Sequence, residues 1–331
     1  MLVLFYHYFH KPNQGGAIGV GLFFCISGYI ITSILLSEFH KSGRINLKRF
    51  YLRRAQRLLP LAYLVIILNI LTFYTLNYFE LLAVDIKQLL LSSIYCIFYV
   101  GNLFGYFGNG YTALSESLVP FWSLGVEEQF YAFWPLLLIF FIRKVRSKYM
   151  YSALVTLIGM SIVFHSISQY IGKTVWTFPL TYFDILFSGC LIAILESEKS
   201  FKIPARFLMT AKLIGFILAF CIIIRGTLPT DFLGQGYTLN YLVELTLFMS
   251  LYKSQIIAKS RVLVSMGDMS YSLYCIHFPI LTLGNIFLSD SIFRLPVIIV
   301  VTFLLAYLSH RFFERLFWIP SYQHKSTRIT K

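Results

Sequence analysis

The sequence predicts an all-α fold, a polytopic integral membrane bundle of about ten helical spans. Of the 331 residues, 58% are hydrophobic and only 13% are charged. Soluble domains carry about a quarter charged residues. Long apolar runs also recur along the chain, and most are long enough to cross a bilayer. A soluble protein with buried helices would need a charged outer layer, which this sequence lacks.

The charge distribution indicates a membrane topology and argues against a nucleic-acid partner. The formal net charge is +14, but the basic residues gather in the loops between apolar runs. That is the pattern of cytoplasmic loops that face anionic lipid. Five cysteines lie within apolar runs and show no CxxC spacing, so we expect packing residues and no metal or disulfide framework. They are Cys25, Cys96, Cys190, Cys221 and Cys275.

The apolar runs define the expected spans. The first ends near His10, and a ten-residue helix reaches about 15 Å, half the hydrocarbon thickness. Either this segment does not span, or the first span is truncated at Met1. The segment lacks the basic region and cleavage site of a signal peptide. The later runs cover residues 17–37, 58–76, 88–107, 121–142, 151–170, 178–195, 211–224, 237–251, 264–288 and 292–313.

We expect one membrane domain over residues 1–320 and a short polar cytoplasmic tail over 321–331. Between the basic residues Arg57 and Arg143 lie three runs. Three crossings would place the second basic loop outside, against the positive-inside rule. Either one of the three runs is re-entrant, or the charge rule fails here.

Two adjacent carboxylates, Glu127 and Glu128, stand near the start of the run over residues 121–142. A carboxylate within a span is unfavourable by roughly 2–4 kcal/mol. In a helix, Ser123, Glu127 and Tyr131 share one face at i, i+4 and i+8. This ladder predicts either a polar contact between two helices or a functional group that faces protein or water.

A second polar stripe, Ser270, Tyr274 and His277, stands at i, i+4 and i+7 in the run over residues 264–288. Pro279 predicts a kink beyond it. An intramembrane histidine is a functional candidate, and a hydrogen bond between helices is the alternative interpretation.

The most basic loop leads into the run that starts at residue 58. Arg54 and Arg57 lie at i, i+3, so both guanidinium groups can bind one phosphate. The alternative is that they anchor the span end by reaching the lipid head groups. We prefer the anchor interpretation for Arg49 and Arg53 and leave both open for Arg54 and Arg57.

Four stretches in this order resemble the acyltransferase family 3 membrane proteins, which acylate cell-surface carbohydrates. Trp122-Ser123-Leu124-Gly125-Val126-Glu127-Glu128-Gln129-Phe130-Tyr131 is the most specific of them. The others are Leu4-Phe5-Tyr6-His7, Arg53-Arg54-Ala55-Gln56-Arg57-Leu58-Leu59-Pro60, and residues 270–279 with their Ser-Tyr-Ser-Leu-Tyr start. The resemblance runs along nearly the whole chain.

The resemblance implies transfer of an acyl group, most often acetyl, from acetyl-CoA or another acyl-CoA to a sugar hydroxyl. It implies that His7 acts in catalysis and that Arg54 and Arg57 engage the donor. For such a reaction, Glu127 or Glu128 could orient the imidazole, and Tyr131, Tyr271 or His277 could donate to an oxyanion. We expect the acceptor to contact Trp122, Ser123, Tyr271 and Tyr274.

The implied acceptor is a surface polysaccharide or a lipid-linked glycan, in a multi-pass protein of the bacterial inner membrane. The chain departs from the family pattern at two places. The family has an arginine eleven positions before the first-span histidine, which here would precede Met1. Many members also have arginine where this chain has Tyr182. The chain lacks the hydrolase-like domain that some members add, so transfer would finish in the membrane domain or pass to a polysaccharide-assembly partner.

Two other functions fit the composition. A polysaccharide exporter or flippase would share the spans, the aromatic residues and the basic loops, but it would not need His7 together with Arg54 and Arg57. A family member that binds without catalysing is the third hypothesis.

Overall fold

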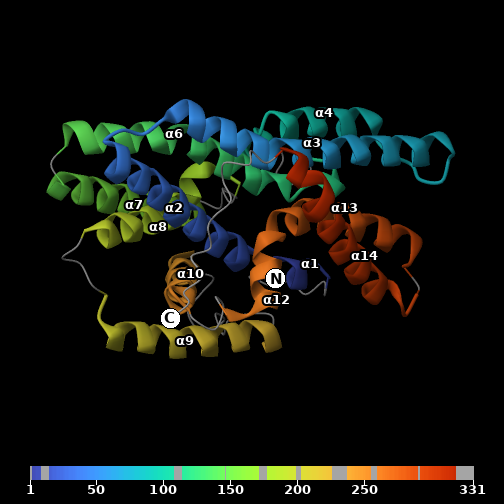
Figure 1. The fold of residues 1–331 in the computed structure, drawn as a ribbon. Coiled ribbons are helices and arrows are strands. Elements are labelled where there is room, and N and C mark those ends of the chain that lie inside the picture. Colours follow the sequence, from blue (N-terminus) through green and yellow to red (C-terminus); the bar gives the residue numbers. More distant parts are fainter. Residues whose placement is uncertain are drawn as a thin grey trace. The chain divides into compact units, whose positions relative to one another are not determined.

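A computed structural model describes residues 2–8, 15–107, 114–145, 147–170, 177–198, 203–225, 237–254, 259–289 and 291–317. Every regular element in these ranges is helical, which confirms the all-α prediction (Figure 1). Among the described residues, six helices are long and apolar enough to cross a membrane, so the expectation of about ten spans is not confirmed. The predicted tail lies outside the described residues.

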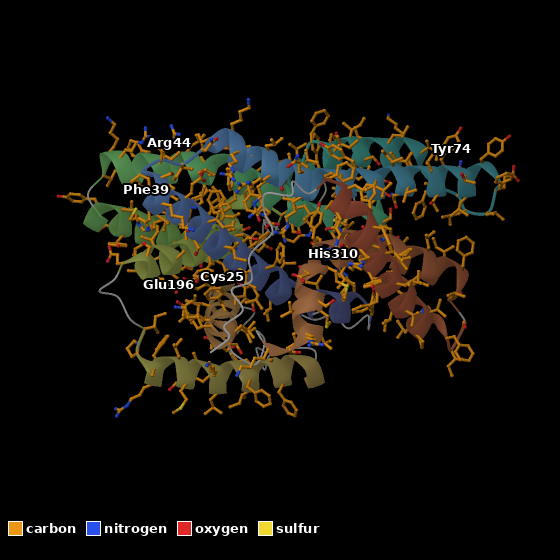
Figure 2. All side chains as sticks on the ribbon, in the orientation of Figure 1. Cys25, Phe39, Arg44, Tyr74, Glu196 and His310 are labelled. Carbon is orange, nitrogen blue, oxygen red and sulfur yellow. The ribbon has the colours of Figure 1, made fainter. Side chains whose placement is uncertain are left out.

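The surface supports a membrane location. Large apolar side chains are exposed along the helices, including Leu71 and Tyr74 (Figure 2). Lipid tails satisfy such side chains, whereas a soluble protein rarely exposes them in contiguous patches. Four of the five cysteines are buried, as the packing interpretation expects: Cys25, Cys96, Cys190 and Cys275.

The chain divides into two compact units, each built from separate parts of the sequence. The large unit holds residues 1–45 and 85–264, and the small unit holds residues 46–84 and 265–331. The helix α12 (Arg261–Asp268) crosses the boundary between these ranges.

The large unit is a bundle whose most extensive contact joins α2 to α8 (Figure 1). Glycines permit this contact: a Cβ atom at Gly28 would lie 2.1 Å from the Leu186 carbonyl oxygen. The absence of a side chain at Gly28 therefore lets the two backbones come close. The helices of the unit are α1 (Leu2–Tyr8), α2 (Gly15–Ser42), α4 (Ile86–Ile97), α5 (Gly101–Phe107), α6 (Phe121–Lys144), α7 (Ser147–Tyr170), α8 (Phe183–Ser197), α9 (Ala205–Arg225) and α10 (Tyr237–Leu251).

The expected run over residues 88–107 is two short helices, α4 and α5. Phe98 caps the first, and Tyr99 follows with a φ of 55°, a left-handed conformation that ends the helix. With its 12 residues, α4 is only about 18 Å long, too short for a span. Two span-length helices, α3 and α6, then separate Arg57 from Arg143. Two crossings would place both basic loops on one side of the membrane, as the positive-inside rule expects.

The small unit contains α3 (Leu47–Tyr78), α13 (Ser270–Phe287) and α14 (Arg294–Leu308). A π-helix (Ser309–Phe313) and a 3₁₀ helix (Glu314–Phe317) follow α14 directly. The start of α3 at Leu47, well before the expected residue 58, has a local cause. The Asn46 side chain caps the helix by accepting from the Arg49 amide at 3.0 Å, and arginine and lysine are good helix formers.

The expected span over residues 264–288 is also divided. It consists of α12 and α13, which meet at Met269, and Pro279 lies inside α13. The long run over residues 292–313 ends in the π-helix, whose wider turn leaves some backbone groups differently paired from those of α14.

Candidate active site

A buried polar cluster joins α2 to α6 in the large unit. The hydroxyls of Ser27 and Tyr131 both donate to the Glu127 carboxylate oxygen Oε1. The Tyr131 hydroxyl also lies 3.1 Å from Ser27 Oγ. Glu127 is only 4% exposed. The predicted contact between Glu127 and Tyr131 is therefore present. The same carboxylate also contacts α2 through Ser27.

The rest of the predicted ladder behaves differently. Ser123 is buried, but its hydroxyl donates to the Pro120 carbonyl at 3.2 Å, within the first turn of α6. Ser27 of α2 adds a donor to the Glu127 carboxylate from outside α6. Ser27 stands among small residues, a pattern that is typical of helix contacts and does not by itself indicate a functional side chain. Only the approach of α2 to α6 distinguishes the two roles.

The second carboxylate, Glu128, lies on another side of α6 and is half-buried. The neighbouring Gln129 holds the helix in place: its Nε2 donates to the Tyr99 carbonyl at 2.8 Å and to Asn102 Oδ1 at 2.9 Å. Gly125 permits this contact, because a Cβ there would lie 2.6 Å from Asn102 Oδ1. Glu127 and Glu128 therefore face different surroundings despite being adjacent in sequence.

Trp122 belongs to an aromatic cluster at the start of α6. Its ring centroid lies 5.3 Å from that of Tyr182 and 6.4 Å from that of Phe24. Tyr182 itself contacts Phe24, with centroids 5.0 Å apart. The Tyr182 ring is thus buried between Trp122 and Phe24.

His7 lies on α1 and is half-buried. The helix α1 packs against α2, the same helix that carries Ser27. In the large unit, the predicted base therefore lies on α1 and Glu127 lies on α6, and both helices contact α2.

The remaining predicted residues belong to the small unit. Arg54 is half-buried and Arg57 is exposed in the first part of α3. The Tyr271 hydroxyl donates to the Leu58 carbonyl at 2.6 Å, so Tyr271 fastens α13 to α3. The Tyr271 hydroxyl, which we expected to donate to an oxyanion or to contact the acceptor, donates to this backbone carbonyl instead.

The predicted stripe on α13 is only partly buried. His277 is fully buried, and its Nδ1 lies 2.6 Å from the Tyr274 carbonyl oxygen. Ser270 is exposed, which corrects its place on a buried stripe. Instead the Ser272 hydroxyl is buried and donates to Glu314, and His310 Nδ1 lies 3.5 Å from the same carboxylate.

The predicted site residues thus fall into two groups. The large unit contains His7, Trp122, Ser123, Glu127, Glu128 and Tyr131, and the small unit contains Arg54, Arg57, Tyr271, Tyr274 and His277. Within the described parts of the chain, no three histidine, cysteine, aspartate or glutamate side chains could together hold a metal ion.

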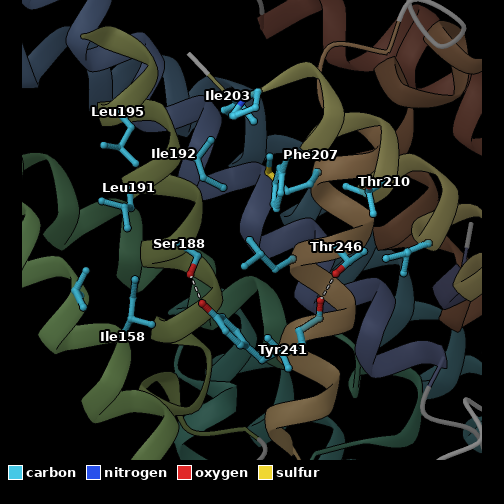
Figure 3. Close-up of a pocket in the computed structure, with 17 residues that line it drawn as sticks. Ile158, Ser188, Leu191, Ile192, Leu195, Ile203, Phe207, Thr210, Tyr241 and Thr246 are labelled. Carbon is cyan, nitrogen blue, oxygen red and sulfur yellow. Dashed lines mark hydrogen bonds between the residues drawn. The ribbon is translucent and has the colours of Figure 1, made fainter. Parts of the chain in front are cut away.

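Sequence reasoning also missed an acidic residue in the large unit. Glu244 of α10 is 4% exposed, and its carboxylate lies against α2, where a Cβ at Gly21 would meet it at 2.1 Å. A neighbouring groove of about 680 Å³ lies among α7, α8, α9 and α10 (Figure 3). Its walls are apolar except for a few hydroxyls, and Ser188 and Tyr241 form a 2.8 Å hydrogen bond in it. None of the predicted site residues lines this groove.

Helices of membrane length around buried polar clusters define a multi-pass membrane protein. The chain belongs to the acyltransferase family, whose acyltransferase domain matches residues 1–311. This range contains every predicted site residue. No solved structure matches the chain.

Two bacterial relatives show the same similarity. The chain is 30% identical over 335 residues to O-acetyltransferase OatA of Staphylococcus aureus (strain NCTC 8325), covering 94% of this chain and 54% of the relative. It is 31% identical over 335 residues to peptidoglycan O-acetyltransferase OatA of Listeria monocytogenes, covering 94% of this chain and 53% of the relative. The chain spans about half the length of these relatives.

Proposed function

We propose that the protein is an integral-membrane O-acyltransferase that moves acetyl from acetyl-CoA to a hydroxyl of a cell-surface polysaccharide or lipid-linked glycan. The observation that carries the proposal is the acyltransferase-domain match over residues 1–311. The names of the relatives favour acetyl as the group transferred and a cell-wall polymer as the acceptor. The same match favours an enzyme over an exporter. The bacterial inner membrane is the location that suits a cytoplasmic donor.

The reaction needs few protein groups. The acceptor hydroxyl oxygen attacks the thioester carbonyl carbon, the C–O bond forms, and the C–S bond breaks to release CoA. His7 takes the hydroxyl proton and returns it to the departing sulfur, a task that suits imidazole. Glu127 supports the base by its negative charge, and Glu128, Tyr131 and His277 are further candidates for orienting or stabilising groups. Trp122, Ser123, Tyr271 and Tyr274 are candidates for acceptor contacts, and no metal is required.

The direct test uses membranes that contain the full chain. Radiolabelled acetyl-CoA is supplied, and label is measured in isolated cell-wall glycan before and after mild alkali, which cleaves O-acetyl esters. We expect alkali-labile label that depends on the protein. Membranes with correctly inserted protein but no labelled glycan would contradict the proposal. Partner proteins of polysaccharide assembly can be added in a parallel reaction to test whether transfer requires them.

The donor site makes a quantitative prediction. Arg54→Ala and Arg57→Ala are each expected to raise the KM for acetyl-CoA about tenfold, because each removes a charge-assisted hydrogen bond to phosphate. The kcat should change little. Arg49→Ala is the matched control, since Arg49 lies in the same basic segment of α3 and was interpreted as a membrane anchor. Equal KM values in all four proteins would exclude this phosphate site.

The Glu127 cluster leads to a second quantitative prediction. Glu127→Gln should lower kcat on the order of 10²-fold because it removes the charge that supports the base. The thermal stability should be kept, since glutamine Oε1 can still accept from Ser27 and Tyr131. Glu116→Gln, at an exposed carboxylate before α6, serves as the control. A fall in the amount of folded protein with unchanged kcat would assign Glu127 a structural role only.

A further inference from the structure

A groove of about 590 Å³ lies within the small unit, among α3, α13, α14 and the π-helix. Leucine, isoleucine, valine and phenylalanine side chains form most of its lining. Three polar residues interrupt this lining: Asn69, Thr72 and Ser309. Polar groups in an otherwise apolar groove fix the orientation of whatever binds there.

Asn69 lacks partners although it is buried. The residue is 3% exposed, and neither its Nδ2 nor its Oδ1 forms a hydrogen bond within the described part of the chain. Ser309 Oγ is buried and lacks a partner in the same sense. Buried polar groups in folded proteins nearly always have partners, so each exception needs a specific explanation, and a bound molecule is one such explanation. Ser309 also begins the π-helix, an element that occurs frequently at functional sites.

The two unpaired atoms of Asn69 restrict the chemistry of a ligand. Nδ2 donates and Oδ1 accepts, so a ligand that satisfies both must offer an acceptor and a donor. A lipid ester or thioester offers acceptors only and would leave Oδ1 unpaired. Two amides joined by a short apolar linker can direct one C=O and one N–H to the same side, as one residue of a β-strand does. Such a chain would satisfy Asn69 while its methylene groups contact the apolar lining.

The pantetheine arm of coenzyme A has this constitution, with two amides separated by two methylene groups. It also ends at phosphates, and α3 provides cations for them. Arg54 stands on the same face of α3 as Leu61, Val65 and Asn69, at spacings of seven, four and four residues. At 1.5 Å per residue, Arg54 and Asn69 are about 22 Å apart along the helix. The second amide lies part-way along the arm: an extended chain from the pyrophosphate to this amide, compared with peptide of the same atom count, reaches roughly 15 Å. The side chains of Arg54 and Asn69 would span the remaining distance.

We propose that this groove binds the pantetheine arm of the acyl donor, with its amides on Asn69 and its phosphates on Arg54. The inference rests on the proposed use of acyl-CoA and adds to it a binding path along α3. Asn69 would select for the amides of the arm, whereas Arg54 would select for the phosphates. Ser309 and Thr72 would bond to the remaining polar atoms of the arm.

The test separates these two contributions with parts of the donor. Purified full-length protein in lipid nanodiscs is titrated calorimetrically with coenzyme A, with pantetheine and with adenosine 3′,5′-bisphosphate. Asn69→Leu should weaken coenzyme A and pantetheine about tenfold each and leave the bisphosphate unchanged, because only the first two possess the amides. Arg54→Ala should weaken coenzyme A and the bisphosphate and leave pantetheine unchanged. Asn69→Ala provides the same comparison if leucine is not accommodated.

Asn77→Leu is the matched control on the same helix. Asn77 Oδ1 accepts from the Val84 amide at 2.9 Å, so its loss should lower thermal stability without changing coenzyme A affinity. Asn69→Leu should instead keep or raise the stability of the ligand-free protein, because it removes unpaired buried groups.

The outcomes are distinguishable. Equal coenzyme A affinity in wild type and Asn69→Leu would overturn the groove and leave the acyl-CoA donor standing. Loss of all three ligands together in Asn69→Leu would also overturn it, since the effect would not be specific to the arm. No coenzyme A binding by wild type, with correct insertion, would overturn the donor and the groove with it.

Discussion

Replacing His7 by alanine is expected to reduce acetyl transfer by at least about 10²-fold, the usual contribution of a general base. The thioester is attacked by a neutral sugar hydroxyl, which becomes an effective nucleophile only as its proton leaves. Imidazole is suited to accept that proton at neutral pH and to return it to sulfur. Because His7 is half-buried on α1, which packs against α2, its substitution should disturb the chemistry more than the fold.

The measurement is single-turnover transfer from labelled acetyl-CoA at saturating donor, so that the KM does not enter. His40→Ala is the control, since His40 is an exposed histidine at the end of α2 in the same unit. Donor binding by His7→Ala should match wild type. Wild-type turnover in the His7 variant would remove the base assignment, whatever its effect on stability.

The sequence predicted the parts of the fold that depend on local spacing. The all-helical membrane class and the long helices α2 and α6 follow from apolar content, because a membrane requires backbone groups to be satisfied within each helix. The contact of Glu127 with Tyr131 follows from the i, i+4 geometry of α6. These features need no knowledge of the neighbouring helices.

Features that depend on neighbours could not be predicted. Apolar content alone cannot show that residues 88–107 break at Tyr99 or that residues 264–288 divide at Met269, because both sides of each break are apolar. The small residues around Ser27 are typical of a helix contact, and only the approach of α6 places Glu127 beside it. Asn69 drew no attention in the sequence because one amide in a long span is common, and only its missing partners mark it.

The largest effect on stability is expected from Gly189→Leu in α8. A Cβ atom at Gly189 would lie 2.1 Å from the Cys25 carbonyl oxygen and 2.8 Å from the Tyr29 amide nitrogen. These are backbone atoms of α2, so no side-chain rotation can relieve the overlap. The two helices would have to separate, at a loss of about 3 kcal/mol or more in the free energy of unfolding.

The control uses a glycine that has space. A Cβ at Gly159 of α7 meets no atom within 4 Å, so Gly159→Leu makes the same change in composition without the overlap. We expect Gly189→Leu to lose the monodisperse peak in size-exclusion chromatography of detergent extracts, and Gly159→Leu to keep it. A Gly189 variant with wild-type Tm would show that α2 and α8 do not approach this closely.

Separation of α2 from α8 should also change the geometry of the candidate active site. Ser27 lies on α2 between Cys25 and Gly28, in the turn whose backbone meets α8. Moving that turn of α2 away from α8 also shifts Ser27 relative to Glu127, to which it donates. The milder Gly189→Ala variant, where it still folds, should therefore lower kcat while leaving the KM for acetyl-CoA unchanged, since Arg54 and Arg57 lie on α3. A change in the KM instead of the kcat would show that the α2–α8 contact does not act through Glu127.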